Sequence, residues 1–378
     1  MSVRTSISGR SAMLRHATRT TSSLCGAGFA RRYLNTARPA FPSRLAFAFD
    51  IDGVLKQGHH ILPQAKRVLS LLSNTSGTLP RPVPYLLMTN GGGVTEAERR
   101  AALSKDFGVE IGPNQLVQSH TPLRDYVSAY ADKPVLVVGG WGDQGRKIAE
   151  SYGLDQAYIL QDLIAWNPSL WDRYHLNAEE ERFVKRGVDF ANIAFSAVFV
   201  IHDNGMDWGL ATQVITELMT SDGGRLGTHK KRGQGKDGEV PLILTNPDVI
   251  WGSDYPLPRL GMGAFRLALE AVYKATTGAE LPYTQFGKPY ESTYTFADKM
   301  LRRHLAELGE DPEEQLSVYM VGDNPESDIA GANAFGWNSL LVKTGVYRDG
   351  EPKHRPTKIV EDVEEGVKWA IEKESKKV

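Results

Sequence analysis

Short apolar runs alternate with amphipathic segments along this chain of 378 residues. The runs are rich in Val, Ile, Phe and Tyr, which favours buried β-strands, while the segments between them place apolar residues at helical spacing. This alternation predicts an α/β fold built on a parallel sheet. The predicted strands cover residues 45–49, 85–88, 133–139, 193–201, 240–244 and 317–321, and the predicted helices cover 63–72, a segment that opens at 95–96, 146–152, 210–219 and 263–277.

The first predicted strand runs directly into two acidic residues. Residues 45–49 are followed by Asp50 and, one position further on, by Asp52 and Gly53. Ligands bind outside the carboxyl ends of parallel strands, and alternation places both carboxylates on the same side. With a divalent cation to screen a phosphate, one carboxylate can attack phosphorus while the other handles the proton of the leaving group. We predict Asp50 as nucleophile and Asp52 as acid and base; a simple turn is the alternative.

A second apolar run ends in small polar residues. Residues 85–88 lead into Thr89, Asn90, Gly91 and two further glycines. A hydroxyl followed by glycines offers an O–H and several backbone N–H groups to an anion, and a helix opens just beyond them. The pattern predicts a phosphate cradle, with an ordinary turn as the alternative.

Two further pieces of candidate chemistry lie in the C-terminal third. Lys288 stands between a glycine and a proline at the start of a helix, where its ammonium could neutralise a phosphate and a nucleophile. A surface turn is the alternative. The strand at 317–321 ends in an acidic stretch that contains Asp323 and Asp328. Because Mg²⁺ takes carboxylate oxygens, we predict these two acids as metal ligands.

A glycine-rich turn in the middle of the chain offers a rival interpretation. Residues 140–145 read Gly-x-Gly-x-x-Gly after an apolar strand, and Asp162 lies seventeen positions beyond the last glycine. This is the dinucleotide-binding pattern. Trp141 and Asp143, however, place bulk and negative charge where a pyrophosphate would pack. A strand-to-helix turn is favoured, and a nicotinamide enzyme stays the alternative.

Composition changes the picture mainly at the N-terminus. The chain is 41% hydrophobic and 24% charged, as in ordinary globular proteins, and no apolar run approaches the roughly 18 residues of a membrane span. Residues 1–44 contain eight Arg and no Asp, Glu or Lys, which is typical of a mitochondrial presequence. A basic arm that binds RNA or membrane is the alternative. Cleavage near Arg32 would leave 38 basic against 45 acidic residues, so we expect no nucleic-acid partner.

Taken in order, the four candidate pieces resemble the motifs of the haloacid dehalogenase (HAD) superfamily. The matching positions are Asp50-Ile-Asp52-Gly for the first motif, Thr89-Asn90 for the second, Lys288 for the third, and Asp323 through Asp328 for the fourth. The resemblance implies a Rossmann-like parallel-sheet core and hydrolysis of phosphomonoesters through an aspartyl-phosphate. It also implies that Mg²⁺ is held by the carboxylate of Asp50, the backbone carbonyl of Asp52 and the fourth-motif acid.

The roughly 150 residues between the second and third motifs resemble the large α/β (C2-type) cap of class IIA members. The implied division is a presequence and linker at 1–44, a core at 45–112 and 263–378, and a cap at 113–262. Residues 221–239 are expected to form a surface loop in that cap. The expected substrate contacts are Thr89, Asn90 and Gly91 in the core and Asp203, Asn204, Asn246 and Asp248 in the cap.

With its Arg-rich leader, the chain is most similar to the mitochondrial class IIA proteins of the cat-eye-syndrome critical-region type. We therefore expect a matrix enzyme, and a large cap favours a small phosphorylated metabolite over polymers. A catalytically silent protein on the same fold, linked to glycerophospholipid metabolism, is one alternative. A phosphotransferase is another. A homodimer formed through the cap is a further expectation, which no residue pattern supports.

Overall fold

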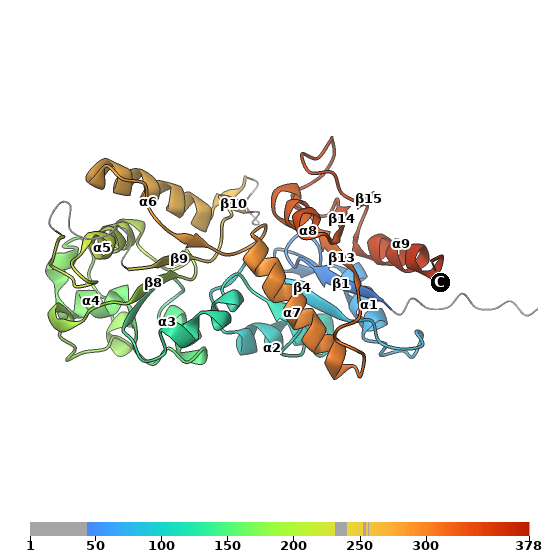
Figure 1. Cartoon of the computed structure of the whole chain (residues 1–378), viewed down its shortest axis with the longest axis horizontal. Coiled ribbons are helices and arrows are strands. Elements are labelled where there is room, and N and C mark those ends of the chain that lie inside the picture. The colour runs from blue at the N-terminus through green and yellow to red at the C-terminus, as the bar shows by residue number, and fades with distance from the viewer. Residues whose placement is uncertain (1–43, 231–239, 252–254, 256, 378) are drawn as a thin grey trace, which may run out of the picture. The chain divides into compact units, whose positions relative to one another are not determined.

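The computed structural model describes residues 44–230, 240–251, 255 and 257–377. The predicted presequence, except for Arg44, and residues 231–239 of the predicted loop lie outside these ranges. Within them, strands form two larger parallel sheets and two short antiparallel pairs (Figure 1). No helix of the described ranges is long and apolar enough to cross a membrane. The predicted α/β fold with a parallel sheet is confirmed.

The first sheet has the strand order β15-β14-β13-β1-β4-β5, and every neighbouring pair is parallel. The central strand β1 aligns Phe49 with Val321 on one side and with Leu87 on the other. Segments far apart in the sequence therefore flank the first strand. The bounds are β1 (Leu45–Phe49), β4 (Tyr85–Met88), β5 (Leu116–Val117), β13 (Ser317–Gly322), β14 (Asn338–Val342) and β15 (Lys358–Val360).

The second sheet is also parallel, in the order β12-β9-β8-β6-β7. Its strands are β6 (Val135–Val138), β7 (Ala157–Ile159), β8 (Ala197–Val200), β9 (Leu242–Leu244) and β12 (Thr284–Gln285). The two antiparallel pairs join β2 (Lys56–Gln57) to β3 (His60–Ile61) and β10 (Ile250–Trp251) to β11 (Arg259–Leu260).

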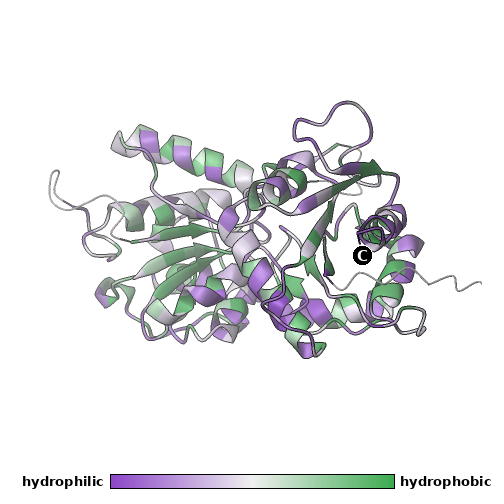
Figure 2. Cartoon of the chain, turned by 45° about the vertical axis from the view of Figure 1, so that its right-hand side comes forward, coloured by the Kyte–Doolittle hydropathy of each residue, from purple (hydrophilic) through white to green (hydrophobic). Residues whose placement is uncertain are grey.

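Helices cover the faces of both sheets. They are α1 (Pro63–Leu72), α2 (Glu96–Phe107), α3 (Gln144–Ser151), α4 (Leu160–Trp166), α5 (Trp208–Thr220), α6 (Met262–Thr277), α7 (Glu291–Glu307), α8 (Ala330–Phe335) and α9 (Val363–Ser375). Figure 2 shows apolar strands inside and polar helix faces outside. Burial of the apolar face is what holds such short helices in place.

The side chains of β1 divide between two hydrophobic clusters. Leu45, Phe47 and Phe49 pack with α1, α2 and α9. Ala46 and Ala48 pack with α7 and α8. Alternation along a strand explains this division, and the two small alanines leave room for the larger side chains of α7.

The start of α2 is fixed by a capping box directly after the glycines at 91–93. The Thr95 hydroxyl accepts a hydrogen bond from the backbone N–H of Glu98 at 3.3 Å, and the Glu98 carboxylate accepts one from the backbone N–H of Thr95 at 3.0 Å. Two otherwise unpaired N–H groups are thereby satisfied. The predicted helix opening is confirmed, and the glycine loop is anchored at its far end.

The second sheet extends beyond the predicted insert. β12 pairs with β9, and α6 contributes Phe265 and Leu269 to the core of that sheet, whereas β5 pairs with β4 in the first sheet. The predicted limits of the cap, 113–262, stay a prediction, and these pairings favour limits further along the chain at both ends. An amphipathic helix does not reveal which sheet its apolar face will cover. We propose that the cap runs from about residue 118 to about residue 286.

The strand predicted over 193–201 is shorter in the structure, where β8 covers Ala197–Val200. Phe195 is buried but its backbone N–H donates to the carbonyl of Gly224 at 2.8 Å, outside the sheet. An apolar run thus indicated burial correctly and overestimated the length of the strand.

The glycine-rich turn at 140–145 is a packing feature. A Cβ atom at Gly145 would lie 2.4 Å from the carbonyl oxygen of Gly139. Asp162, the candidate ribose ligand, is fully buried and accepts hydrogen bonds from Arg146 Nη1 at 2.7 Å and from two backbone N–H groups. A carboxylate engaged in this way is not free for a ribose. The structure favours the strand-to-helix turn over the dinucleotide site.

The Arg146–Asp162 pair yields a stability prediction. In Asp162→Asn the Arg146 guanidinium, only 5% exposed, would stay buried without its counter-charge. We expect the free energy of unfolding to fall by about 3 kcal/mol in urea titrations. The matched control is Asp143→Asn, which breaks a partly exposed ion pair with Lys147 and should cost ~0.5 kcal/mol or less. Equal losses in the two variants would contradict the assignment.

Candidate active site

Three predicted site residues follow the carboxyl ends of neighbouring strands in the first sheet. Asp50 comes directly after β1, Thr89 after β4 and Asp323 after β13. The backbone N–H of Asp50 donates to the carbonyl of Val321 at 2.9 Å, which extends the pairing of β1 with β13 up to the acid. The parallel register therefore brings these side chains to one edge of the sheet, as the sequence predicted.

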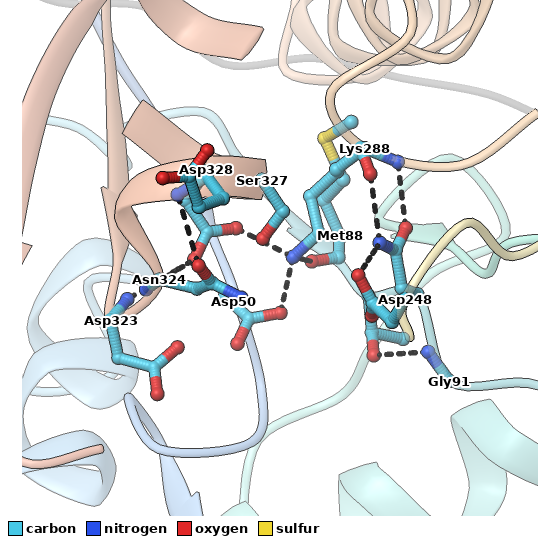
Figure 3. Close-up of polar contacts among 12 residues, drawn as sticks. Asp50, Met88, Gly91, Asp248, Lys288, Asp323, Asn324, Ser327 and Asp328 are labelled. Carbon is cyan, nitrogen blue, oxygen red and sulfur yellow. Dashed lines mark hydrogen bonds and ion pairs between the residues drawn. The ribbon is translucent and has the colours of Figure 1, made fainter. Parts of the chain in front are cut away.

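Lys288 connects two of the acids. Its Nζ donates to Asp50 Oδ1 at 2.5 Å, to Asp328 Oδ1 at 2.7 Å and to the carbonyl of Met88 at 3.1 Å (Figure 3). The Lys288 side chain is only 3% exposed. All three donor positions of the ammonium are thus used, and the cation compensates two buried negative charges.

The fourth-motif acids are held by backbone N–H groups. Asp328 Oδ2 accepts from the N–H groups of Asp323 and Asn324, both at 3.1 Å, and Asp323 Oδ2 accepts from Val346 at 2.6 Å. A Cβ atom at Gly345 would lie 1.8 Å from Asp323 Oδ2, so only glycine lets the backbone approach this carboxylate. The acids are therefore preset in position.

These contacts create a set of oxygen donors that fits a hard divalent cation. Asp50, Asp323 and Asp328 each offer one carboxylate oxygen, and these oxygens lie within 4.8 Å of one another. Mg²⁺ prefers such oxygen ligands. Asp52, also predicted at the metal, is exposed, and its carboxylate is not part of this group. The resemblance assigned its backbone carbonyl, not its side chain, to the metal.

Burial and charge shift the titration of these groups. Burial raises the pKa of Asp50 well above its usual range; Lys288 opposes that shift and Asp328 adds to it. Burial and the charge of Asp328 raise the pKa of Asp323 to about 7. Burial alone would lower the pKa of Lys288, but Asp328 and Asp50 raise it well above its usual value. Without a bound cation, the cluster therefore carries more negative charge than its surroundings stabilise.

Asn90 positions Lys288. Its Oδ1 accepts from the backbone N–H of Lys288 at 2.7 Å, and its Nδ2 donates to the carbonyl of Lys288 at 3.0 Å and to Asp248 Oδ1 at 3.1 Å. Both the oxygen and the nitrogen of the Asn90 amide therefore form hydrogen bonds within the protein. We predicted a substrate contact here, whereas the structure indicates that Asn90 fixes the backbone from which the lysine side chain extends.

The remaining first-sheet candidates lie close to one another. Thr89 Oγ1 accepts from the backbone N–H of Gly91 at 2.9 Å. A Cβ atom at Gly91 would lie 3.1 Å from Thr89 Oγ1 and 3.8 Å from Asp52 Oδ2. The predicted acid and the predicted phosphate loop are therefore neighbours, and the exposed carboxylate of Asp52 faces that loop.

The candidates from the second sheet divide into two groups. Asn246 Oδ1 accepts from the backbone N–H of Asp248 at 2.8 Å, so it shapes the turn that brings Asp248 to Asn90. Burial raises the pKa of Asp248 to about 6. Asp203 and Asn204, in contrast, adjoin His202. The structure brings Asp248 to the lysine through Asn90, while Asn246 acts one step further away.

Sequence reasoning missed several groups around this site. Ser119 and His120 follow β5, and His202 follows β8; His120 and His202 lie against the glycine loop. None of them belongs to a recognisable motif. The glycine triplet was the available signal, because consecutive glycines permit bulky neighbours to approach the backbone closely.

The raised pKa values give a pH prediction for the metal-free protein. The folded chain holds protons at Asp50 and Asp323 that the unfolded chain releases near pH 4, so its stability falls as the pH rises from about 4 to about 7. We expect a lower midpoint of thermal unfolding at pH 7.5 than at pH 5 in the presence of EDTA. Asp323→Asn should flatten this dependence. A wild-type midpoint that rises over the interval, or a variant with the same slope, would contradict the electrostatic interpretation.

Comparison with known proteins places the chain in a family. A family model described as haloacid dehalogenase-like hydrolase matches residues 47–155, and one described as HAD-hydrolase-like matches residues 285–366. A protein from Saccharomyces cerevisiae named mitochondrial hydrolase is 36% identical over 350 residues, which cover 87% of this chain and 96% of that protein. A Schizosaccharomyces pombe protein is 39% identical over 336 residues.

The S. pombe relative is named cardiolipin synthase (CMP-forming)/mitochondrial hydrolase fusion protein, and the match covers 87% of this chain and 53% of that protein, so the chain spans about half its length. Among solved structures, a p-nitrophenyl phosphatase from Archaeoglobus fulgidus is similar with a TM-score of 0.55 and 18% identity, over 87% of this chain and 100% of that one. A glycerol phosphate phosphatase from Mycobacterium tuberculosis in complex with magnesium has a TM-score of 0.53 and 19% identity, over 88% and 78% of the two chains. With two matching family models and a relative at 36% identity along nearly its whole length, this chain belongs to the haloacid dehalogenase-like hydrolases.

Proposed function

We propose that the chain is a Mg²⁺-dependent phosphomonoester hydrolase that works through an aspartyl-phosphate on a small phosphorylated metabolite. The observation that carries this proposal is the buried cluster of three carboxylates, two of which, Asp50 and Asp328, bind Lys288. A carboxylate nucleophile, a cation and a set of metal ligands are what phosphoryl transfer to an aspartate requires.

The contacts of Asp50 suit a nucleophile. Lys288 binds its Oδ1, and Oδ2 receives no hydrogen bond from the described residues. In the first step an Asp50 oxygen forms a bond to phosphorus while the bond from phosphorus to the ester oxygen breaks, and Asp52 gives its proton to the departing alkoxide. In the second step Asp52 removes a proton from the water that attacks phosphorus, and the carboxylate of Asp50 is regenerated as phosphate leaves.

The other residues stabilise charge and geometry in this scheme. Lys288 offers a fixed positive charge beside the phosphoryl oxygens, and Thr89 offers its hydroxyl. Asp50, Asp323 and Asp328 would hold Mg²⁺, which when bound screens the negative charge of phosphate and nucleophile. Asn90 fixes the position of the Lys288 backbone through two hydrogen bonds. A small displacement of Asn90 should therefore move the lysine ammonium relative to the carboxylate of Asp50.

The proposal also covers substrate size and location. The second sheet and its helices form the large insert that we expect to exclude bulky polymers, which favours small substrates. The two most similar relatives reported above carry the word mitochondrial in their names, and residues 1–44 have the composition of a presequence. We place the enzyme in the mitochondrial matrix.

A second candidate is a catalytically silent protein of the same fold with a role tied to glycerophospholipid metabolism. The single observation that favours this link is the name of the S. pombe relative, in which cardiolipin synthase and mitochondrial hydrolase are fused. The two candidates separate if phosphate release is measured from p-nitrophenyl phosphate, glycerol 3-phosphate and a short-chain phosphatidate, because the silent protein would release phosphate from none of them.

The nucleophile assignment predicts loss of turnover in Asp50→Asn. We expect kcat for p-nitrophenyl phosphate to fall by at least about 10³-fold, because a carboxamide cannot form the acyl phosphate. Phosphate release with Mg²⁺ measures the effect. The control is Asp311→Asn on the exposed surface, which should retain full activity. Comparable activity in the two variants would overturn the assignment.

The metal assignment predicts a shift in Mg²⁺ dependence. Asp323→Asn should raise the Mg²⁺ concentration for half-maximal activity by at least roughly tenfold, because one ligand oxygen loses its charge. Glu326→Gln is the matched control, since Glu326 lies in the same acidic stretch but is exposed and pairs with Lys353 at 3.0 Å. Activity of the wild type that is insensitive to EDTA, or equal shifts in both variants, would contradict the metal assignment.

A further inference from the structure

A second polar cluster lies against the glycine loop that follows Asn90. A Cβ atom at Gly92 would lie 3.0 Å from His120 Cδ2, 3.1 Å from Ser119 Oγ and 3.5 Å from His202 Cδ2. These three side chains come from two sheets, because Ser119 and His120 follow β5 and His202 follows β8. The three side chains therefore lie against the same run of glycines, residues 91–93.

Two of these side chains carry buried polar atoms that no described residue satisfies. Ser119 and His120 have no exposed surface, and within the described ranges neither Ser119 Oγ nor His120 Nε2 has a hydrogen-bond partner. Buried polar atoms in native proteins are nearly always satisfied by protein, water or ligand. Unsatisfied atoms at consecutive positions beside a candidate active site thus indicate a site for a polar group.

The hydrogen bonds of the two histidines define what they offer. Tyr152 donates its O–H to Glu96 at 2.8 Å, so its oxygen accepts from His120 Nδ1 at 2.7 Å. His202 Nδ1 accepts from the backbone N–H of Asn204 at 3.0 Å, which leaves a proton on Nε2. Burial and the neighbouring His202 lower the pKa of His120 to about 3, and burial lowers that of His202, so both rings are neutral.

Arg99 supplies the positive charge of the cluster. It lies four residues after Thr95, the N-cap of α2, in the helix that begins directly after the glycine loop. Its charge contributes to lowering the pKa of His202, after the larger effect of burial. Arg99 is half-buried. Within the part of the chain that the structure describes, its side chain forms no hydrogen bond, ion pair or ring contact, whereas every other lysine and arginine there that is not exposed has such a partner. A half-buried positive charge of this kind favours the binding of an anion.

We infer that a leaving group would lie toward this cluster. Gly91 adjoins the carboxylate of Asp52, the proposed proton donor to the ester oxygen, and Gly92 adjoins the cluster. Gly92 and Arg99 are half-buried and the His202 side chain is 12% exposed, so the edge of the cluster reaches solvent while Ser119 and His120 form its floor.

We propose that Arg99, Ser119, His120 and His202 form a subsite for the alcohol portion of the substrate, and that this portion carries a second anionic oxygen group. Arg99 binds the anionic group, while Ser119, His120 and His202 provide hydrogen bonds for its oxygens and for an adjacent hydroxyl. The inference rests on the proposed hydrolase function and narrows its substrate class to phosphomonoesters with a second carboxylate or phosphate.

The test compares four substrates with the full chain and Mg²⁺. Phosphoglycolate carries a carboxylate, fructose 1,6-bisphosphate a second phosphate, and glycerol 3-phosphate and p-nitrophenyl phosphate neither. In Arg99→Gln we expect KM to rise about tenfold for phosphoglycolate, for the bisphosphate or for both, with kcat within about twofold. KM for the other two substrates should stay within about twofold. The substrate whose KM rises identifies the anionic group as carboxylate or phosphate.

Two variants separate binding from general effects. Lys105→Gln removes a charge from the exposed face of the same helix and should change none of the four KM values. Arg99→Lys keeps the charge and should restore most of the lost affinity. If the wild type hydrolyses p-nitrophenyl phosphate but Arg99→Gln shifts all four KM values alike, or none, the subsite is wrong and the hydrolase function stands. If the wild type hydrolyses none of the four, the proposed function fails and the subsite fails with it.

Discussion

The ammonium of Lys288, held between two buried carboxylates, is the interaction on which this site depends. Asp50 and Asp328 are each less than a tenth exposed, and bringing two such charges together in the interior is unfavourable unless a cation lies between them. Lys288 reaches both from a segment more than 200 residues beyond Asp50 in the sequence. The site therefore exists only when β1, β13 and the turn before α7 are all in place.

That dependence explains how the surrounding residues are used. Asn90 forms two hydrogen bonds with the backbone of Lys288 and a third with Asp248, so the second motif holds the third. Because Gly345 has no side chain, the backbone at this position can lie close to the carboxylate of Asp323. Residues from separate motifs thus hold the same site in place, and we expect the effects of their substitutions on activity to be non-additive.

Electrostatics and topology together prepare the site for a divalent ion. Lys288 compensates part of the negative charge of the three carboxylates. Burial raises the pKa of Asp50 and Asp323, which shows that their charged forms are unfavourable here. A bound divalent cation would reduce the remaining repulsion among the carboxylates. Near the start of α2, the half-buried Arg99 carries a positive charge that no described acidic residue pairs with. A substrate with two anionic groups would meet both requirements.

The sequence by itself determined the fold class, most elements and the members of the cluster. The run at 45–49 became β1 with the predicted bounds, the helix at 63–72 became α1, and the acids after β1 and β13 lie where parallel strands end. These features depend on local patterns: period, caps and strand ends. Only the tertiary structure decided that α6 belongs to the second sheet, that Asn90 is committed to Lys288, that Asp162 is buried in an ion pair, and that Ser119, His120 and His202 meet the glycine loop. Those facts depend on which distant segments pack together, and no period or spacing along one chain specifies the partner of a buried polar group.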